Sequence, residues 1–269
     1  MTMQAEARQD AWTAGDSYER YMGRWSRQIA ERFLDWLDPP AGADWVEVGC
    51  GTGALTSEIL RRALPRSILA TDPAGGFVIH TRNALRDPRA RFQQAVADQL
   101  PTASSSADLL VSGLVLNFVP DRAAALAEAR GVLRPGGQLA FYVWDYPGGG
   151  LGFVDAFWKE AAKLDPAAGV LDEAVRFPFC RPRVLAEMCT QAGFAEPNVV
   201  PIEITAEFPD FDAYWTPFTL GTGPAPGYCL GLSPELRSSL RTRLKERLES
   251  DGPIRLTARA WAVRARNPT

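Results

Sequence analysis

Short apolar runs alternate with helix-like stretches through the first half of the chain. The runs that predict strands cover residues 45–48, 68–72, 95–98, 107–112 and 138–143. Helical spacing follows over residues 55–64 and 122–133. Strands that alternate with helices build a parallel sheet, because each crossover helix returns the chain to the same edge. We therefore expect a doubly wound α/β core over residues 43–146.

The segments on either side of this core break its rhythm. Residues 17–38 predict a helix with a broad apolar face, which Pro39 and Pro40 end. That face consists of Tyr18, Tyr21, Met22, Trp25, Ile29, Phe33 and Trp36. After the core, residues 147–150 read Pro-Gly-Gly-Gly and mark a flexible break. We interpret residues 147–181, with a helix over 153–164, as a cap insertion.

Regular elements return after this first cap. Residues 183–192 predict a helix that Gly193 closes, and residues 199–208 predict a strand. Residues 210–232 are rich in proline, glycine and aromatic residues and predict a second, irregular cap insertion. Ser233 then caps a helix that runs to Glu249. Residues 255–264 alternate apolar and polar positions, which predicts the last strand.

Three glycines at alternate positions follow the first apolar run. Gly49, Gly51 and Gly53 stand between the run at 45–48 and the helical stretch that begins at residue 55. Glycine lets the backbone approach a ligand closely, and the helix that follows presents free N–H groups to the same point. The turn therefore predicts a nucleotide-like ligand. A dinucleotide fits the pattern Gly49-x-Gly51-x-x-Ala54, and S-adenosylmethionine fits it as well.

Acidic residues end the next two apolar runs. Asp72 follows the second run, where a carboxylate can accept both hydroxyls of an adenosine ribose. Asp98 ends the expected third strand, where it can meet the adenine amino group. A Pro-Gly-Gly turn at 135–137 precedes the fifth strand. A dinucleotide-binding domain needs neither Asp98 nor that turn, so S-adenosylmethionine is favoured.

This ordered set resembles the class I S-adenosylmethionine-dependent methyltransferases, within them the small-molecule branch that includes ubiquinone and menaquinone biosynthesis enzymes (type 11). The match runs from residue 17 to residue 146. The resemblance implies a seven-stranded, mostly parallel sheet in the order 3-2-1-4-5-7-6 with the last strand antiparallel. It also implies one methyltransferase domain over residues 1–269, with residues 17–38 as an N-terminal lid and 43–146 as the cofactor-binding core.

The resemblance also implies which residues bind the cofactor. In the family an acid at the position of Glu47 steadies the glycine turn, and an aromatic residue of the lid closes over the methionine end. Tyr21 and Arg24 are the lid candidates, with core packing as the equal alternative for the aromatic side chains. The complete expected set is Tyr21, Arg24, Glu47, Gly49, Cys50, Gly51, Thr52, Gly53, Asp72, Pro73, Ala97, Asp98, Gln99, Ser112 and Gly113.

Catalytic side chains are expected after the fourth and fifth strands, because ligands of such sheets bind beyond the carboxyl ends of the strands. Asn117 follows the fourth strand, where it can bond to a substrate oxygen or cap a turn before Pro120. Asp145 follows the fifth strand, where it can serve as a base or substrate anchor, or form the turn before Pro147. His80, the single histidine, falls on the second helix, away from the expected methyl group.

The two caps carry the features expected to recognise a substrate. Their aromatic residues suit an apolar or planar molecule, although core packing explains some of them. These residues are Trp158, Phe177, Phe179, Tyr214, Trp215, Phe218 and Tyr228. Arg176 and Arg181 can bind a carboxylate or stay as surface charge.

Composition narrows the class further. The formal net charge is −3, and no basic stretch with interleaved aromatic residues indicates nucleic-acid binding. The four cysteines have no metal-site spacing, so no metal is expected. No signal peptide is visible, which predicts a cytoplasmic protein. The leading hypothesis is a methyltransferase that acts on O, N or C of a small molecule. The alternatives are an NAD(P)-dependent oxidoreductase and a binding protein for S-adenosylmethionine without transfer.

Overall fold

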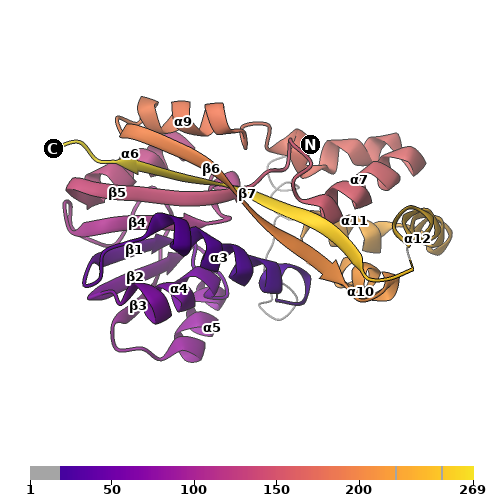
Figure 1. The fold of residues 1–269 in the computed structure, drawn as a ribbon, viewed down its shortest axis with the longest axis horizontal. Coiled ribbons are helices and arrows are strands. Elements are labelled where there is room, and N and C mark those ends of the chain that lie inside the picture. Colours follow the sequence, from indigo (N-terminus) through magenta and orange to yellow (C-terminus); the bar gives the residue numbers. More distant parts are fainter. Residues whose placement is uncertain (1–18, 222, 250) are drawn as a thin grey trace. The chain divides into compact units, whose positions relative to one another are not determined.

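The computed structural model describes residues 19–221, 223–249 and 251–269 (Figure 1). Tyr18 of the predicted lid lies outside this part. The described chain divides into two compact units. The sheet unit comprises Ser26–Val143, Phe179–Ile202 and Ala260–Thr269, and the helical unit comprises Trp144–Pro178, Glu203–Arg259 and the described residues before Ser26. The expected single domain over residues 1–269 stays a prediction.

Seven strands form one sheet in the order β3-β2-β1-β4-β5-β7-β6. The strands are β1 (Asp44–Val48), β2 (Ser67–Asp72), β3 (Ala90–Gln94), β4 (Ala107–Gly113), β5 (Leu133–Trp144), β6 (Ala195–Phe208) and β7 (Ile254–Arg266). From β3 to β5 all neighbours pair in parallel. β7 runs against β5, since the Asn267 N–H donates to the Gly137 carbonyl and the Asp145 N–H donates to the Arg259 carbonyl. The predicted order and the antiparallel strand are confirmed.

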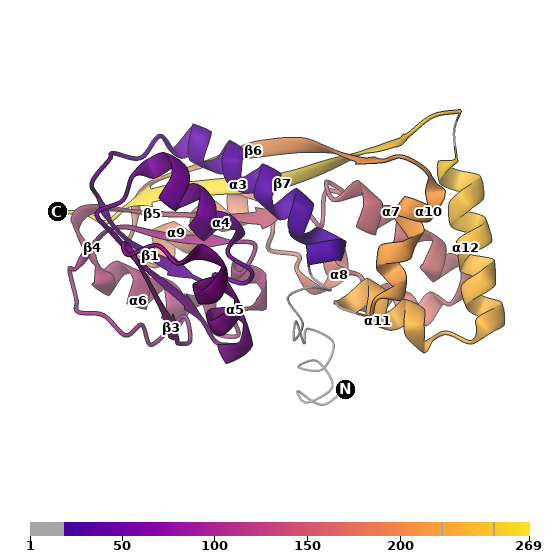
Figure 2. The ribbon, with the colours of Figure 1, turned by 90° about the horizontal axis from the view of Figure 1, so that it is seen from below.

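The strand order dictates where the helices of the sheet unit lie. The chain passes from β1 through β2 to β3 in one direction and from β4 to β5 in the other, so right-handed crossovers place their helices on opposite faces. α5 packs against β2 and β3, and α6 packs against β4 (Figure 2). The helices are α3 (Arg24–Leu37, in the sheet unit from Ser26), α4 (Ala54–Glu58), α5 (Gly75–Leu85), α6 (Arg122–Val132) and α9 (Pro182–Gln191).

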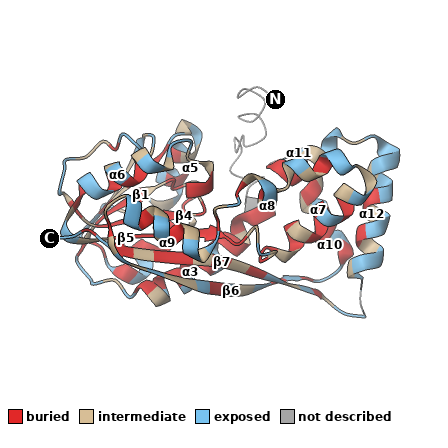
Figure 3. Cartoon of the chain, turned by 90° about the horizontal axis from the view of Figure 1, so that it is seen from above, coloured by how far each residue is buried: buried red, intermediate tan, exposed pale blue. Residues whose placement is uncertain are grey.

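The hydrophobic core of the sheet unit centres on its middle strands. Leu109, Leu110 and Val111 of β4 are all buried (Figure 3). A parallel strand with helices on both faces reads as such a continuous apolar run. The expected turn at 135–137 is instead an irregularity inside β5. The pairing with β4 jumps there from Leu133 to Gln138, and Gly136 has a φ of +77°.

Short helices make up most of the helical unit. They are η1 (Glu19–Gly23), α7 (Gly152–Leu164), η4 (Pro166–Leu171), α8 (Glu173–Arg176), α10 (Phe211–Trp215), η5 (Thr216–Thr219), α11 (Pro224–Gly231) and α12 (Pro234–Leu248). The predicted helix over 153–164 corresponds to α7. The Ser233 cap of α12 is confirmed, because its hydroxyl accepts a hydrogen bond from the Leu236 N–H at 3.3 Å.

The expectation of an irregular segment over residues 210–232 is wrong, because α10, η5 and α11 occupy most of it. The Asp210 side chain caps α10 by accepting from the Ala213 N–H at 2.8 Å. Pro217 and Pro224 stand in the first turns of η5 and α11, where a missing N–H costs nothing. Proline therefore starts helices in this segment, although a proline-rich composition usually indicates irregular structure. Within the described residues, no helix has the length and apolarity to cross a membrane.

Candidate cofactor and substrate site

The glycine turn after β1 holds a conformation that other residues rarely adopt. Gly49, Gly51 and Gly53 have φ angles of +76°, +51° and +88°. The N–H groups of Gly49 and Cys50 both donate to the Thr71 carbonyl at 2.8 Å, which ties the turn to β2. Left-handed dihedrals strain any residue with a Cβ atom, so this backbone course depends on glycine.

The three glycines differ in what surrounds them. A Cβ atom at Gly49 would lie 2.3 Å from a Val115 methyl carbon, and one at Gly53 would lie 2.7 Å from a Thr81 methyl carbon. Those two glycines allow close packing within the protein. A Cβ atom at Gly51 would meet nothing within 4 Å. Open space beside a left-handed glycine leaves the backbone accessible to a ligand.

Asp72, the last residue of β2, faces this turn and is only 7% exposed. One carboxylate oxygen accepts from the Gly51 N–H at 3.0 Å and the other accepts from the Ala74 N–H at 2.9 Å. Burial raises the pKa of Asp72, and the two backbone hydrogen bonds oppose that rise. Since each carboxylate oxygen has two lone pairs, both can still accept from a ligand hydroxyl.

Glu47 connects the glycine turn to the neighbouring elements through hydrogen bonds. Its buried carboxylate accepts from the Thr56 hydroxyl of α4 at 2.6 Å, and its backbone carbonyl accepts from the Thr71 hydroxyl at 2.9 Å. Burial raises the pKa of Glu47 to about 7, and the nearby Asp72 charge adds to the rise. These bonds connect β1, α4 and β2, which is the arrangement expected of an acid that steadies the turn.

The last residues of β4 and the turn after it lie at the same edge of the sheet. The Ser112 hydroxyl donates to the Val48 carbonyl at 2.8 Å, and Gly113 gives room to the Tyr142 hydroxyl, which a Cβ atom would approach to 2.5 Å. Asn117 follows in the single turn η3 (Leu116–Phe118) and is 4% exposed. Its Nδ2 has no hydrogen-bond partner among the described residues. An unsatisfied buried amide costs about 1–3 kcal/mol, so this donor suits a ligand acceptor.

The third strand lies earlier in the chain than we expected. β3 spans Ala90–Gln94, so the prediction of a strand ending at Asp98 is wrong. Edge strand β3 buries little and carries polar Arg91 and Gln93, which hid it from a search for apolar runs. Asp98 and Gln99 are exposed in the turn that follows, and Ala97 is half-buried there. They still follow the carboxyl end of a strand.

The remaining expected cofactor residues of the sheet unit are Cys50, Thr52 and Pro73, and they differ in burial. Cys50 is buried, and burial raises the pKa of its thiol. Thr52 lies half-buried in the glycine turn. Pro73 is exposed after Asp72, and its carbonyl accepts from the Gln94 side chain at 2.8 Å. Among the described residues, no group of three or more histidine, cysteine or acidic side chains could hold a metal ion.

Tyr21 and Arg24 belong to the helical unit. The buried Tyr21 ring makes edge contacts with Phe153 at 6.2 Å and with Phe218 at 5.6 Å between ring centroids. The Arg24 guanidinium lies 4.0 Å from the centroid of the Trp25 ring and also covers Phe208. The buried Nε of Arg24 has no hydrogen-bond partner in the described chain. The rings pack within the helical unit, Arg24 keeps a donor without a partner among the described residues, and the lid role of both residues stays a prediction.

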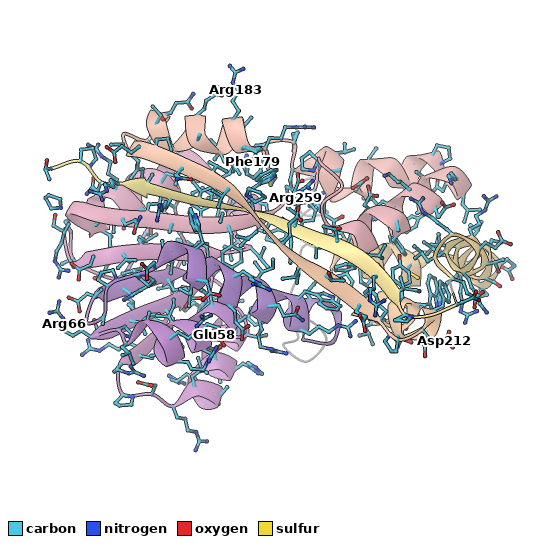
Figure 4. The ribbon with its side chains drawn as sticks, viewed as in Figure 1. Glu58, Arg66, Phe179, Arg183, Asp212 and Arg259 are labelled. Carbon is cyan, nitrogen blue, oxygen red and sulfur yellow. The ribbon has the colours of Figure 1, made fainter. Side chains whose placement is uncertain are left out.

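Asp145 also lies in the helical unit, directly after β5, and is 2% exposed. Its carboxylate accepts from the Nε of Arg259 at 2.8 Å and from the Gly148 N–H at 3.0 Å. Figure 4 labels Arg259 on β7. Both carboxylate oxygens are thus engaged, and the Gly148 bond forms the turn that we considered as the alternative to a catalytic role.

Three further side chains that the sequence analysis considered, His80, Phe179 and Arg181, also lie in the sheet unit. His80 is exposed on α5, and Arg181 is exposed before α9. Phe179 lies 4.3 Å below the Arg122 guanidinium within the sheet unit (Figure 4). Sequence reasoning missed Glu173, a buried acid of α8, because no neighbouring residue marks it as different from a surface glutamate.

Comparison with known proteins indicates one class. A family model described as Methyltransferase domain matches residues 46–141. An uncharacterized 37.1 kDa protein in a transposon of Streptomyces fradiae is 32% identical over 190 residues, which cover 70% of this chain and 53% of that protein. The trans-aconitate 2-methyltransferase of Deinococcus radiodurans is 36% identical over 129 residues, 48% of either chain. The chain thus spans about half the length of these curated relatives.

A solved structure shares the fold. Phosphoethanolamine N-methyltransferase 2 of Haemonchus contortus, in complex with S-adenosyl-L-methionine, matches 100% of this chain and 61% of its own with a TM-score of 0.61 at 12% identity. The matched domain, the sheet order and the glycine turn are those of the class I S-adenosylmethionine-dependent methyltransferases. Within that class, residues 46–141 are a type 11 methyltransferase domain, so the resemblance predicted from the sequence is confirmed.

Proposed function

We propose that this protein transfers a methyl group from S-adenosylmethionine to an oxygen, nitrogen or carbon atom of a small molecule and releases S-adenosylhomocysteine. The pairing of Gly51 with Asp72 carries the proposal. Open space beside a left-handed glycine meets a buried carboxylate with which no lysine or arginine of the described residues forms an ion pair. Such a pair suits an uncharged group with two hydroxyls pressed against the backbone, as in the ribose of this cofactor.

Further cofactor contacts are proposed from the resemblance. Asp98 would bond to the adenine amino group, with Ala97, Gln99 and Pro73 beside it. Ser112 and Gly113 would border the methionine end, where Arg24 would bind the cofactor carboxylate through its unused Nε. Tyr21 would close over the cofactor as the lid aromatic residue.

The cofactor supplies a methyl group that its sulfonium charge already activates. The chain's own task is therefore to hold the accepting atom in line and to exclude water. We assign Asn117 to the accepting molecule, because its buried Nδ2 lacks a partner in the described chain. Asp145 is the second candidate, and its carboxylate would have to be shared between Arg259 and the substrate.

The substrate is proposed to be small and apolar or aromatic, since buried rings are abundant in the helical unit. The relative named for trans-aconitate supports a small molecule. Residues 147–181 and 210–232 would act as specificity elements of one methyltransferase domain. The net charge of −3 disfavours a nucleic-acid substrate. The cytoplasmic location predicted from the sequence stays a prediction.

Ligand binding to matched variants tests the proposal. We expect S-adenosylmethionine and S-adenosylhomocysteine, but neither NAD nor NADP, to raise the melting temperature. Asp72→Asn should weaken binding by about tenfold to a hundredfold, because an amide cannot accept two hydroxyls and two N–H groups. Asp108→Asn, which changes an acid at the opposite edge of the same sheet, should leave binding intact.

Two outcomes would contradict the proposal and favour one of the alternative functions. A shift with NAD or NADP would favour the oxidoreductase. Tight binding of S-adenosylmethionine without transfer of a labelled methyl group to any molecule of a metabolite extract would favour the binding protein without transfer.

A further inference from the structure

Three acids are buried among the described residues of the helical unit, and they differ in what neutralises them. Asp145 pairs with Arg259. Glu160, 4% exposed, pairs with Lys163 at 2.7 Å and with Arg247 at 2.9 Å. Glu173 is 5% exposed, yet no lysine or arginine of the described chain forms an ion pair with it. Among the described side chains, its hydrogen-bond partner is the neutral indole N–H of Trp158.

The Trp158 ring that binds this acid belongs to a cluster of aromatic side chains. Trp158 packs on Tyr228 with ring centroids 5.5 Å apart and meets the edge of Phe157 at 5.3 Å. Phe157 stacks on Phe218 at 4.5 Å, and Phe218 contacts Tyr21. Tyr21 lies close enough to Glu173 for the carboxylate charge to raise the pKa of its hydroxyl, after burial, which is the larger cause.

An unpaired carboxylate in such surroundings is costly. Moving a charged group out of water costs several kcal/mol unless an opposite charge compensates. A neutral side chain at position 173 would avoid that cost, and it could keep a hydrogen bond to Trp158. Aromatic rings have negative faces that attract cations, as in the aromatic cages that bind ammonium groups. The acid and the rings therefore select the same kind of ligand.

We propose that Glu173, with Trp158 and Tyr21, forms a recognition site for a protonated amine on the methyl-accepting substrate. This inference rests on the proposed methyltransferase function and adds the substrate's charge to it. Glu173 binds the ammonium group through its carboxylate, and the neighbouring rings face the attached carbon atoms. The methyl-accepting atom is not thereby fixed, because the amine can serve as an anchor.

Burial supports this assignment by raising the pKa of Glu173 to about 7. The other charged or titratable groups that act on this carboxyl group are Asp172 and Arg176, and it acts in turn on Tyr21. An ammonium group bound beside Glu173 stabilises the ionised form. Near neutral pH, binding of an amine then releases a proton from Glu173, whereas binding of an alcohol releases none.

Calorimetry with two matched probes tests the site. 2-Phenylethylamine carries the ammonium group, and 2-phenylethanol has a similar shape without the charge. We expect the amine to bind at least tenfold more tightly than the alcohol and its binding enthalpy to vary with the buffer's ionisation enthalpy. Glu173→Gln keeps an oxygen for Trp158 but removes the charge, so it should abolish both differences. Glu160→Gln should retain them, because that acid is already neutralised.

The outcomes separate this inference from the proposed function. Equal binding of amine and alcohol by the unaltered protein, or no binding of either, overturns the amine site even where Glu173→Gln does not fold. An unchanged preference in Glu173→Gln overturns it as well. S-adenosylhomocysteine is titrated in parallel. Its failure to bind the unaltered protein counts against the methyltransferase proposal, whereas loss of amine preference alone leaves that proposal intact.

Discussion

The two edges of the parallel sheet in the sheet unit use polar residues in opposite ways. At the edge where the parallel strands begin, Asp44 and Asp108 both pair with Arg134, and Asp44 also pairs with Arg66 (Figure 4). At the edge where these strands end, Asp72 is buried against backbone N–H groups, and no cation of the part of the chain that the structure describes pairs with it.

Two buried asparagines repeat this contrast. The Nδ2 of Asn267, beside the start of β5, donates to the carbonyls of Arg130, Leu133 and Arg134. The Nδ2 of Asn117, after β4, has no partner in the described chain. One edge satisfies its polar groups internally and contributes stability. The other leaves a buried acceptor and a buried donor available, as a ligand site requires.

The asparagines should give the largest difference. Asn267→Ala removes three hydrogen bonds at 2.9–3.2 Å. It should lower the free energy of unfolding by about 2–4 kcal/mol. Asn117→Ala removes no internal hydrogen bond and should change it by less than about 1 kcal/mol, while slowing methyl transfer. Denaturant titration compares the two variants, and equal losses would contradict the division between the edges.

The acids should give opposite responses to pH. Glu47 has its pKa raised to about 7, above the ordinary value of 4.5, so its contribution to stability is complete at low pH and is lost as pH rises through 7. The Arg66 guanidinium holds the pKa of Asp44 well below its ordinary value, so its contribution is present above that value and is lost as pH falls.

Single variants separate the two contributions to the dependence of the free energy of unfolding on pH. Glu47→Gln should remove a decline of about 1–3 kcal/mol in the free energy of unfolding between pH 4.5 and 7. Asp44→Asn should flatten only the acid limb. Unfolding titrations across the pH range measure both, and a Glu47→Gln profile that still declines toward neutral pH would refute the assignment.

Substitution of two glycines should give the smallest change in stability and a difference in ligand binding between the two edges. Gly42 and Gly51 have φ angles of +74° and +51°, and a Cβ atom at either would meet nothing within 4 Å. Alanine at either position should therefore cost about 1 kcal/mol of stability through backbone strain. Only Gly51→Ala should weaken S-adenosylhomocysteine binding, by at least tenfold, since Gly42 precedes β1 at the opposite edge. Similar affinities of the two variants would remove Gly51 from the binding site.

Sequence reasoning was strongest where backbone geometry demands particular residues. The turn from Gly49 to Gly53 and the acid at Asp72 could be predicted because glycine and a strand-terminal carboxylate leave a local signal. The sheet order followed from the family resemblance that those residues carry. β3 was misplaced, since a strand at the sheet edge needs few apolar side chains and Ala90–Gln94 offers a mostly polar pattern.

Features that depend on distant contacts were out of reach. Glu160 and Glu173 each follow a charged residue and precede an alanine in the sequence, yet Glu160 forms ion pairs with two cations and Glu173 forms none within the described residues. Those partners lie on other elements or one helical turn away, so no local pattern distinguishes the two. Likewise, the ion pair between Asp145 and Arg259 of β7 could not be predicted, because 114 residues separate the two in the sequence.

The position of β7 means that the sheet cannot be completed until the end of the chain has been synthesised. It follows every other strand of the sheet in the chain, yet it lies between β5 and β6. During synthesis on the ribosome, β5 and β6 therefore emerge long before the strand that joins them, and both have unpaired backbone groups meanwhile. Such edges recruit strands from other chains. Insertion of β7 covers the free edges of β5 and β6 and so removes this route to aggregation. At high expression, the yield of folded protein therefore depends on how quickly β7 inserts.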